Sequence, residues 1–235
     1  IVKLNIDETL NEIRRPISVS DENVSVPDGF AKWQKTNVEK QSQSGFNAVF
    51  IGLESGDITA NQLRSVAELI RDYSAEGFAR NGFSQNIVIR YVHDDDLKSL
   101  YSKLLETGLA KTGSLTMAAA VGCSGTTSCN LALTNSHRLA KEVQRKFLEL
   151  NLDEDDDLRD STIKISGCPN SCGQHEVATI GFYGGGGRHE SEMYPNYTMS
   201  IGGRFDGGSM LGHHTARVPV KRVIPVILKI LDLYR

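Results

Sequence analysis

Two cysteine-bearing stretches decide how this chain folds and what it binds: GCSGTTSCNLALT at residues 122–134 and KISGCPNSCGQ at residues 164–174. The cysteines of the first stretch enclose five residues, those of the second enclose three, and the 235-residue chain has no others. Four thiolates are what a 4Fe–4S cluster requires. Paired zinc ligands usually lie two to four residues apart, so the five-residue gap fits zinc less well. The predicted metal ligands are Cys123, Cys129, Cys168 and Cys172.

The residues around the ligands suit a bulky cofactor. Gly122, Gly125, Gly167 and Gly173 flank the cysteines and remove Cβ atoms where backbone must approach closely. Cys129 is expected to open a helix, which would place a partly positive helix end beside an anionic cluster. The apolar side of that helix is predicted to be Leu139, Val143, Phe147 and Leu150.

Composition bounds the class of protein. A net charge of −3 and a pI near 6.1 do not show the excess of basic residues that is typical of proteins binding nucleic acid or an anionic membrane. The longest apolar stretch, residues 223–234, is interrupted by charges and is too short to span a bilayer. Four cysteines in a chain of this length do not resemble a secreted disulfide framework, so a cytoplasmic or plastid compartment with reduced thiols is expected.

Residues 43–112 are predicted to form a ferredoxin-like half-domain of β-α-β-α order. An apolar strand at 46–53 precedes Thr59 and Gln62, whose spacing is that of a helix capping box. The buried stripe of the helix that follows is predicted to be Leu63, Val66, Ile70 and Tyr73. A β-branched strand at 86–92 then leads through three aspartates, at 94–96, into a second helix with a leucine stripe.

Residues 113–235 are predicted to form a mixed sheet with helices. Strands are expected at 161–166, 177–183 and 197–202, with the glycine run 184–187 as a flexible hairpin connection. A final helix from about residue 220 is expected to bury Val223, Ile227, Ile230 and Leu231. Residues 1–42 are polar and mixed, with a short helical pattern at Ile6, Leu10 and Ile13, and are predicted to be a linker or the tail of an upstream part.

The two cysteine stretches strongly resemble the sirohaem- and cluster-binding signature of the nitrite and sulfite reductase superfamily, and the resemblance extends over roughly residues 28–235. It implies that Cys172 ligates both the cluster and the sirohaem iron and is the catalytic thiolate. RNGFSQN at 80–86 is similar to the family segment RxTxxQN, with Gly82 in place of the threonine. The cofactor-binding residues that the resemblance implies are Arg80, Gln85, Asn86, Asn130 and Asn170.

The resemblance implies an α+β or α/β fold and an oxidoreductase. A complete subunit of the family has two related halves, of which this chain looks like the second, so the N-terminal half of the same parent chain is an expected partner. The basic residues that bind the substrate oxyanion are expected in that first half. The expected reaction is the six-electron reduction of nitrite to ammonia, with ferredoxin or another electron donor. Reduction of sulfite to sulfide, or a half-enzyme fragment without cofactor or activity, stay open as alternatives.

Overall fold

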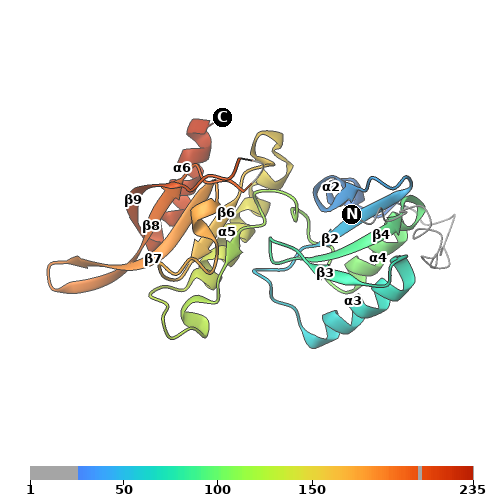
Figure 1. The fold of residues 1–235 in the computed structure, drawn as a ribbon, viewed down its shortest axis with the longest axis horizontal. Coiled ribbons are helices and arrows are strands. Elements are labelled where there is room, and N and C mark those ends of the chain that lie inside the picture. Colours follow the sequence, from blue (N-terminus) through green and yellow to red (C-terminus); the bar gives the residue numbers. More distant parts are fainter. Residues whose placement is uncertain (1–25, 206–207, 235) are drawn as a thin grey trace, which may run out of the picture. The chain divides into compact units, whose positions relative to one another are not determined.

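The computed structural model describes residues 26–205 and 208–234 (Figure 1). The chain divides into two compact units, the first ending at Ser114 and the second beginning at Leu115. The helical pattern predicted at Ile6, Leu10 and Ile13 lies outside the described residues. No helix in the described ranges is both long and apolar enough to cross a membrane.

The first unit is a four-stranded antiparallel sheet packed against helices. Its elements are α2 (Phe30–Asn37), β1 (Val38–Lys40), β2 (Phe46–Ile51), α3 (Ala60–Tyr73), β3 (Ala79–Asn81), β4 (Ile87–His93), a 3-10 turn at Asp94–Asp96 and α4 (Leu97–Glu106). The strand order is β1-β2-β4-β3. Inward residues of β2 and β4, such as Val49 and Ile89, pack in one core with Val66 of α3 and Leu100 of α4. The predicted β-α-β-α order is confirmed.

Local chemistry explains where α3 begins and which side it buries. The Thr59 side chain accepts from the Gln62 amide at 3.2 Å, and the Gln62 side chain accepts from the Thr59 amide at 3.1 Å, so the predicted capping box is present. Leu63 is 52% exposed, contrary to the predicted stripe, whereas Leu69 is buried. Figure 1 shows α3 along the unit's outer edge, and a helix there buries only a narrow stripe.

Part of the stretch predicted as a linker is regular structure. Residues 30–40 form α2 and β1, and Trp33 is fully buried with its ring 5.0 Å from that of Tyr101 on α4. Burial of this indole anchors a helix whose other side chains are mostly polar. The structured first unit therefore begins before residue 42.

The second unit is a five-stranded mixed sheet covered by two helices. Its elements are β5 (Val121–Gly122), α5 (Ser136–Glu149), β6 (Ile163–Ser166), β7 (Ile180–His189), β8 (Glu192–Ile201), β9 (His213–Pro219), α6 (Val223–Tyr234) and 3-10 turns at Gly125–Thr127, Leu152–Glu154, Asp156–Leu158, His175–Val177 and Val220–Arg222. The order is β5-β6-β7-β8-β9; the first two pairings are parallel and the last two antiparallel. The predicted mixed sheet with helices is confirmed.

Two local predictions in the second unit are wrong. Cys129 does not open a helix: α5 begins at Ser136, where the Asn135 side chain accepts from the Arg138 amide at 2.9 Å and so provides the cap. The glycines at 184–187 are not a hairpin loop, because they lie within β7 and pair residue by residue with β8. The hairpin instead turns between His189 and Glu192.

Candidate metal centre

Both cysteine stretches follow neighbouring parallel strands. Cys123 comes directly after β5, and Cys168 comes two residues after β6. Because the carboxyl ends of parallel strands meet at the same edge of a sheet, the two stretches lie together there. The Cys123 amide donates to the Ile165 carbonyl at 3.1 Å, and the Gly167 amide donates to the Cys123 sulfur at 3.1 Å. The two predicted ligand loops therefore lie against each other.

Glycine residues, which have no side chain, allow the backbone segments to approach one another at this site. A Cβ atom built on Gly167 would lie 2.9 Å from the Gly125 Cα atom. A Cβ on Gly184 would lie 2.0 Å from Thr134 Oγ1 and 2.4 Å from the Gly167 carbonyl oxygen. Only glycine permits such approaches. The glycine run in β7 therefore lets that strand pass directly against the loop that precedes Cys168.

The four thiols differ in exposure. Cys123, Cys129 and Cys168 are partly buried, whereas Cys172 is exposed, and all four are free. Among the described residues, no group of three or more His, Cys, Asp or Glu side chains is arranged to hold a metal ion. The donor chemistry and the glycine-lined backbone nevertheless fit a four-thiolate cluster, because all four sulfurs belong to two loops that are hydrogen-bonded to each other.

Cys123 has the best-defined surroundings of the four. Its sulfur lies 3.1 Å from the Ser136 hydroxyl, which also donates to the Cys123 carbonyl at 2.9 Å. Ser136 is fully buried at the first turn of α5. Hydrogen bonds to cluster sulfurs are one of the means by which a protein sets the reduction potential. Ser136 is a site residue that the cysteine pattern does not reveal.

The loop after Cys129 presents apolar side chains. Leu131 is 68% exposed and Leu133 is 57% exposed, although both are large hydrophobic residues. The predicted cofactor-binding residues Asn130 and Asn170 are exposed beside Cys129 and Cys168. Sequence reasoning missed the two leucines, because their unpartnered exposure is visible only in the fold. Together these residues form a mixed polar and apolar rim next to the thiols.

A buried tyrosine lies beneath the same loops. Tyr197 of β8 is 1% exposed and pairs with Gly184 of β7. Burial raises the pKa of Tyr197 to about 12. Its phenol is therefore neutral through the physiological range and acts as a hydrogen-bonding group rather than a source of protons.

The other predicted cofactor residues gather on one hairpin of the first unit. Arg80 lies on β3, and Gln85 and Asn86 lie in the turn that leads to β4. Asn86 is buried, and its Oδ1 atom has no hydrogen-bond partner among the described residues. A Cβ on Gly82 would lie 1.9 Å from that oxygen. The glycine that departs from the family pattern therefore leaves room for the Asn86 side chain.

Arg80 belongs to a group of three charges. It forms an ion pair with Glu76, which also accepts from Arg90 Nη2 at 2.9 Å and Nε at 3.2 Å. Burial by itself would raise the pKa of Glu76, but the hydrogen bonds from Arg90 and Arg80 lower it below the ordinary value of 4.5. Two guanidinium groups on one carboxylate leave a net positive charge on this face of the hairpin.

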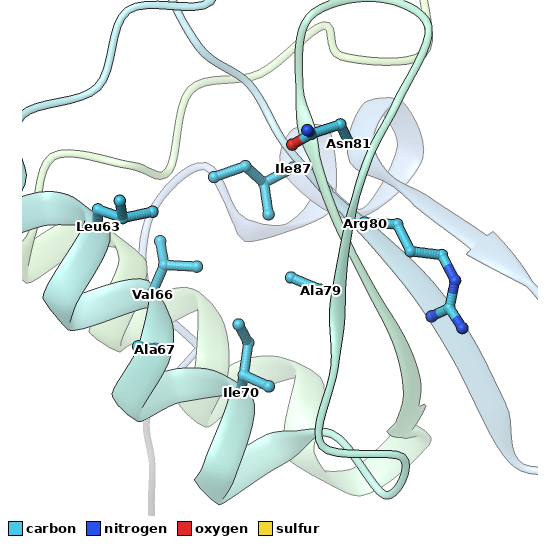
Figure 2. Close-up of a pocket in the computed structure, with 8 residues that line it drawn as sticks. All are labelled: Leu63, Val66, Ala67, Ile70, Ala79, Arg80, Asn81 and Ile87. Carbon is cyan, nitrogen blue, oxygen red and sulfur yellow. The ribbon is translucent and has the colours of Figure 1, made fainter.

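An apolar groove of about 230 Å³ lies beside this hairpin. Figure 2 shows its lining side chains between α3 and the β3–β4 hairpin, with the Arg80 guanidinium directed away from the helix. The groove is lined mainly by aliphatic side chains, among them Leu63, Ile70 and Ile87. It offers no convergent set of titratable groups, so it is not a second candidate centre.

Comparison with known proteins gives two adjacent family matches. The nitrite/sulfite reductase ferredoxin-like half domain matches residues 39–107, and the nitrite and sulphite reductase 4Fe-4S domain matches residues 114–235. The ferredoxin–nitrite reductase of Synechococcus elongatus is 29% identical over 206 residues, covering 86% of this chain and 39% of the relative. The chloroplastic ferredoxin–nitrite reductase of Spinacia oleracea is 30% identical and covers 83% of this chain and 32% of the relative.

A sulfite reductase also matches, over less of the chain. The ferredoxin sulfite reductase 1 of Mycolicibacterium paratuberculosis is 28% identical, covering 60% of this chain and 26% of the relative. Among solved structures, the NirA protein of Mycobacterium tuberculosis has the same fold, with a TM-score of 0.65 and 22% identity over 84% of this chain and 36% of that protein. The chain thus spans well under half the length of these relatives.

Proposed function

Because the chain belongs to the nitrite and sulphite reductase 4Fe-4S domain family, we propose that it is the cofactor-binding half of a sirohaem-dependent nitrite reductase. In this proposal residues 43–112 are the ferredoxin-like half-domain and residues 113–235 bind the cofactors. The observation that supports it is the hydrogen bond from the Gly167 amide to the Cys123 sulfur, which holds the two cysteine loops against each other.

Each predicted residue has a chemical role in this proposal. Cys123, Cys129, Cys168 and Cys172 would hold the 4Fe–4S cluster, with the Cys172 thiolate also ligating the sirohaem iron. When bound, the coupled centre would pass single electrons to a substrate on that iron. The exposed position of Cys172 suits a sulfur that must contact two groups at once.

The hairpin residues supply anion-binding chemistry. The guanidinium of Arg80 carries five donors, and its ion pair with Glu76 leaves donors for the carboxylates of a tetrapyrrole. The unpartnered Oδ1 of Asn86 is an acceptor that a cofactor group would satisfy. Gln85, Asn130 and Asn170 are proposed to complete these contacts. The basic residues that bind the substrate oxyanion belong, in this proposal, to the N-terminal half of the parent chain.

Nitrite is the preferred substrate, with ferredoxin as electron donor. The ferredoxin–nitrite reductases above align with more than four fifths of the chain, whereas the sulfite reductase aligns with three fifths. Sulfite is the second candidate because that relative shares the same domain. A cytoplasmic or plastid location is part of the proposal, and it is supported by the relatives named as chloroplastic.

The first test is the visible spectrum of anaerobically purified protein, with iron, sulfide and sirohaem quantified. We expect sirohaem bands together with more iron than the macrocycle accounts for. Cys172→Ser should remove both the cluster and the macrocycle bands, because one sulfur serves both, whereas Ser128→Ala, an exposed neighbour of Cys129, should leave them unchanged. An iron-free, colourless wild-type chain would support the fragment alternative, and a full complement in Cys172→Ser would refute the role of this thiolate.

A further inference from the structure

Two side chains of β6 hold the loop that carries Cys172. Side chains alternate between the faces of a strand. Ile163 and Ile165 point into the core of the second unit, so Lys164 and Ser166 project from the opposite face. Both are nevertheless buried, at 9% and 1% exposure, because the Cys172 loop covers them.

The loop itself has a backbone that needs support. Ser171 and Gln174, on either side of Cys172, have φ angles of 57° and 59°. Residues with a side chain rarely adopt this left-handed region, and they stay there only where their surroundings hold them. Gly173 sits so close to β6 that a Cβ on it would lie 2.3 Å from the Ile165 carbonyl oxygen.

Ser166 is the centre of the contacts that hold this backbone. Its Oγ accepts from the Gly173 amide at 3.1 Å and lies 3.0 Å from Nδ1 of His175. His175 is buried, and burial lowers its pKa, so the imidazole is neutral near pH 7. A neutral ring leaves Nδ1 able to accept the Ser166 hydroxyl proton, and all three groups are then paired.

Lys164 holds the next residue of the loop. Its Nζ donates to Oε1 of Gln174 at 2.7 Å. Gln174 is the second residue in the left-handed region, and its amide donates to the Ser171 carbonyl at 2.7 Å. The two bonds from β6 are thus made to consecutive residues after Cys172, one to the Gly173 backbone and one to the Gln174 side chain.

We propose that Ser166 and Lys164 are positioning residues that set the direction of the Cys172 thiol for metal binding. Cys172 is exposed, so packing of its own side chain does not orient it and the 171–174 backbone must do so. The nature of the metal centre rests on the proposed function, whereas the holding of the loop by β6 does not. The two are therefore tested separately.

The loop is tested by amide hydrogen exchange in the metal-free full chain. Ser166→Ala should speed exchange of the Gly173 amide roughly three- to tenfold, because one hydrogen bond is lost. Thr162→Ala is the matched control: it also removes a β6-side hydroxyl that accepts a backbone amide, that of Thr179 at 3.1 Å. This control should leave Gly173 unchanged.

The metal centre is tested by reconstituting the chain with iron and sulfide and recording the EPR spectrum of the reduced cluster. Ser166→Ala and Lys164→Met should each shift the g-values or lower the cluster content, whereas Thr162→Ala should match wild type. Ser166→Thr, which keeps the hydroxyl, should restore the wild-type spectrum.

The outcomes separate the two proposals. If exchange at Gly173 is the same in Ser166→Ala and Thr162→Ala, the positioning inference is overturned whatever the cluster does. Faster exchange with an unchanged EPR spectrum also overturns it, because the loop would then be held without consequence for the metal. If wild type assembles no cluster but exchange changes as expected, the proposed function fails while β6 is shown to hold the loop.

Discussion

At the scale of single residues, Gly82 and Asn86 depend on each other. A Gly82 Cβ would overlap Asn86 Oδ1 and lie 3.2 Å from a Val88 methyl group. Replacing glycine in an unstrained strand position usually stabilises a protein slightly. Here we expect Gly82→Ala to lower the free energy of unfolding of the first unit by about 1–3 kcal/mol, because the new methyl group forces a displacement.

A double-mutant cycle followed by urea unfolding checks this cause. In an Asn86→Ala background the overlap is absent, so the cost of Gly82→Ala should fall below about 1 kcal/mol. Equal costs in the two backgrounds would show that backbone conformation, and not the Asn86 side chain, disfavours a residue larger than glycine.

Only some residues of the candidate site can be recognised in the sequence. The four cysteines can be proposed as ligands from sequence, because they stand in two short, glycine-rich stretches. Ser136 and Ser166 were not readable, since a serine that contacts a ligand loop through the fold looks in sequence like any other. The buried His175, whose Nδ1 atom lies 3.0 Å from Ser166 Oγ, is a further contact of this kind.

At the scale of elements, Glu76 joins the end of α3 to strands β3 and β4. Its pKa is below 4.5 in the folded unit, where Arg90 and Arg80 hydrogen-bond to the ionised form. A carboxyl with a lowered folded pKa stabilises the fold above its unfolded pKa, and that contribution is lost as pH falls through the folded value. We expect Glu76→Gln to cost roughly 1–2 kcal/mol at pH 7, less than for a fully buried pair, because both guanidinium groups are more than a third exposed.

Urea unfolding at several pH values measures this dependence. The difference between wild type and Glu76→Gln should shrink as pH falls below about 4.5. Glu106→Gln is the matched control, because its pair with Lys103 is on the surface and should contribute little. A pH-independent difference at Glu76 would indicate a packing effect in place of an ion pair.

Elements with strong periodicity were predicted, and those held by tertiary contact were not. The Thr59 capping box and the final helix, with Val223 and Ile227 fully buried, follow from local pattern. Helix α2 is held chiefly by burial of Trp33, and β7 runs through a glycine segment because β8 pairs with every residue of it. Neither cause has a local sequence signal. Trp33 packs against Tyr101, which is remote in the chain, and the glycines of β7 are weak β formers.

At the scale of the whole molecule, the described residues contain two separate hydrophobic cores. The cores share no residue, and the units divide between Ser114 and Leu115. The sequence did not show what ends the first unit. Asn37 holds this end in place: its Nδ2 lies within hydrogen-bond distance of the carbonyl oxygens of Phe50 and Lys111, both at 2.8 Å, and of Ser114 Oγ at 2.9 Å.

This arrangement predicts two calorimetric unfolding transitions that respond to different substitutions. Asn37→Ala should lower the stability of the first unit by about 2–3 kcal/mol, because it removes the donor to the carbonyls of Phe50 and Lys111. For a unit of this size that corresponds to a shift of roughly 10 °C or more in one transition. Asn135→Ala, which removes the cap of α5, should lower the stability of the second unit by about 1 kcal/mol. The transition of the first unit should stay at its wild-type temperature. A single transition displaced by both variants would mean that the two cores unfold as one cooperative body, and the chain would then have to be treated as one domain.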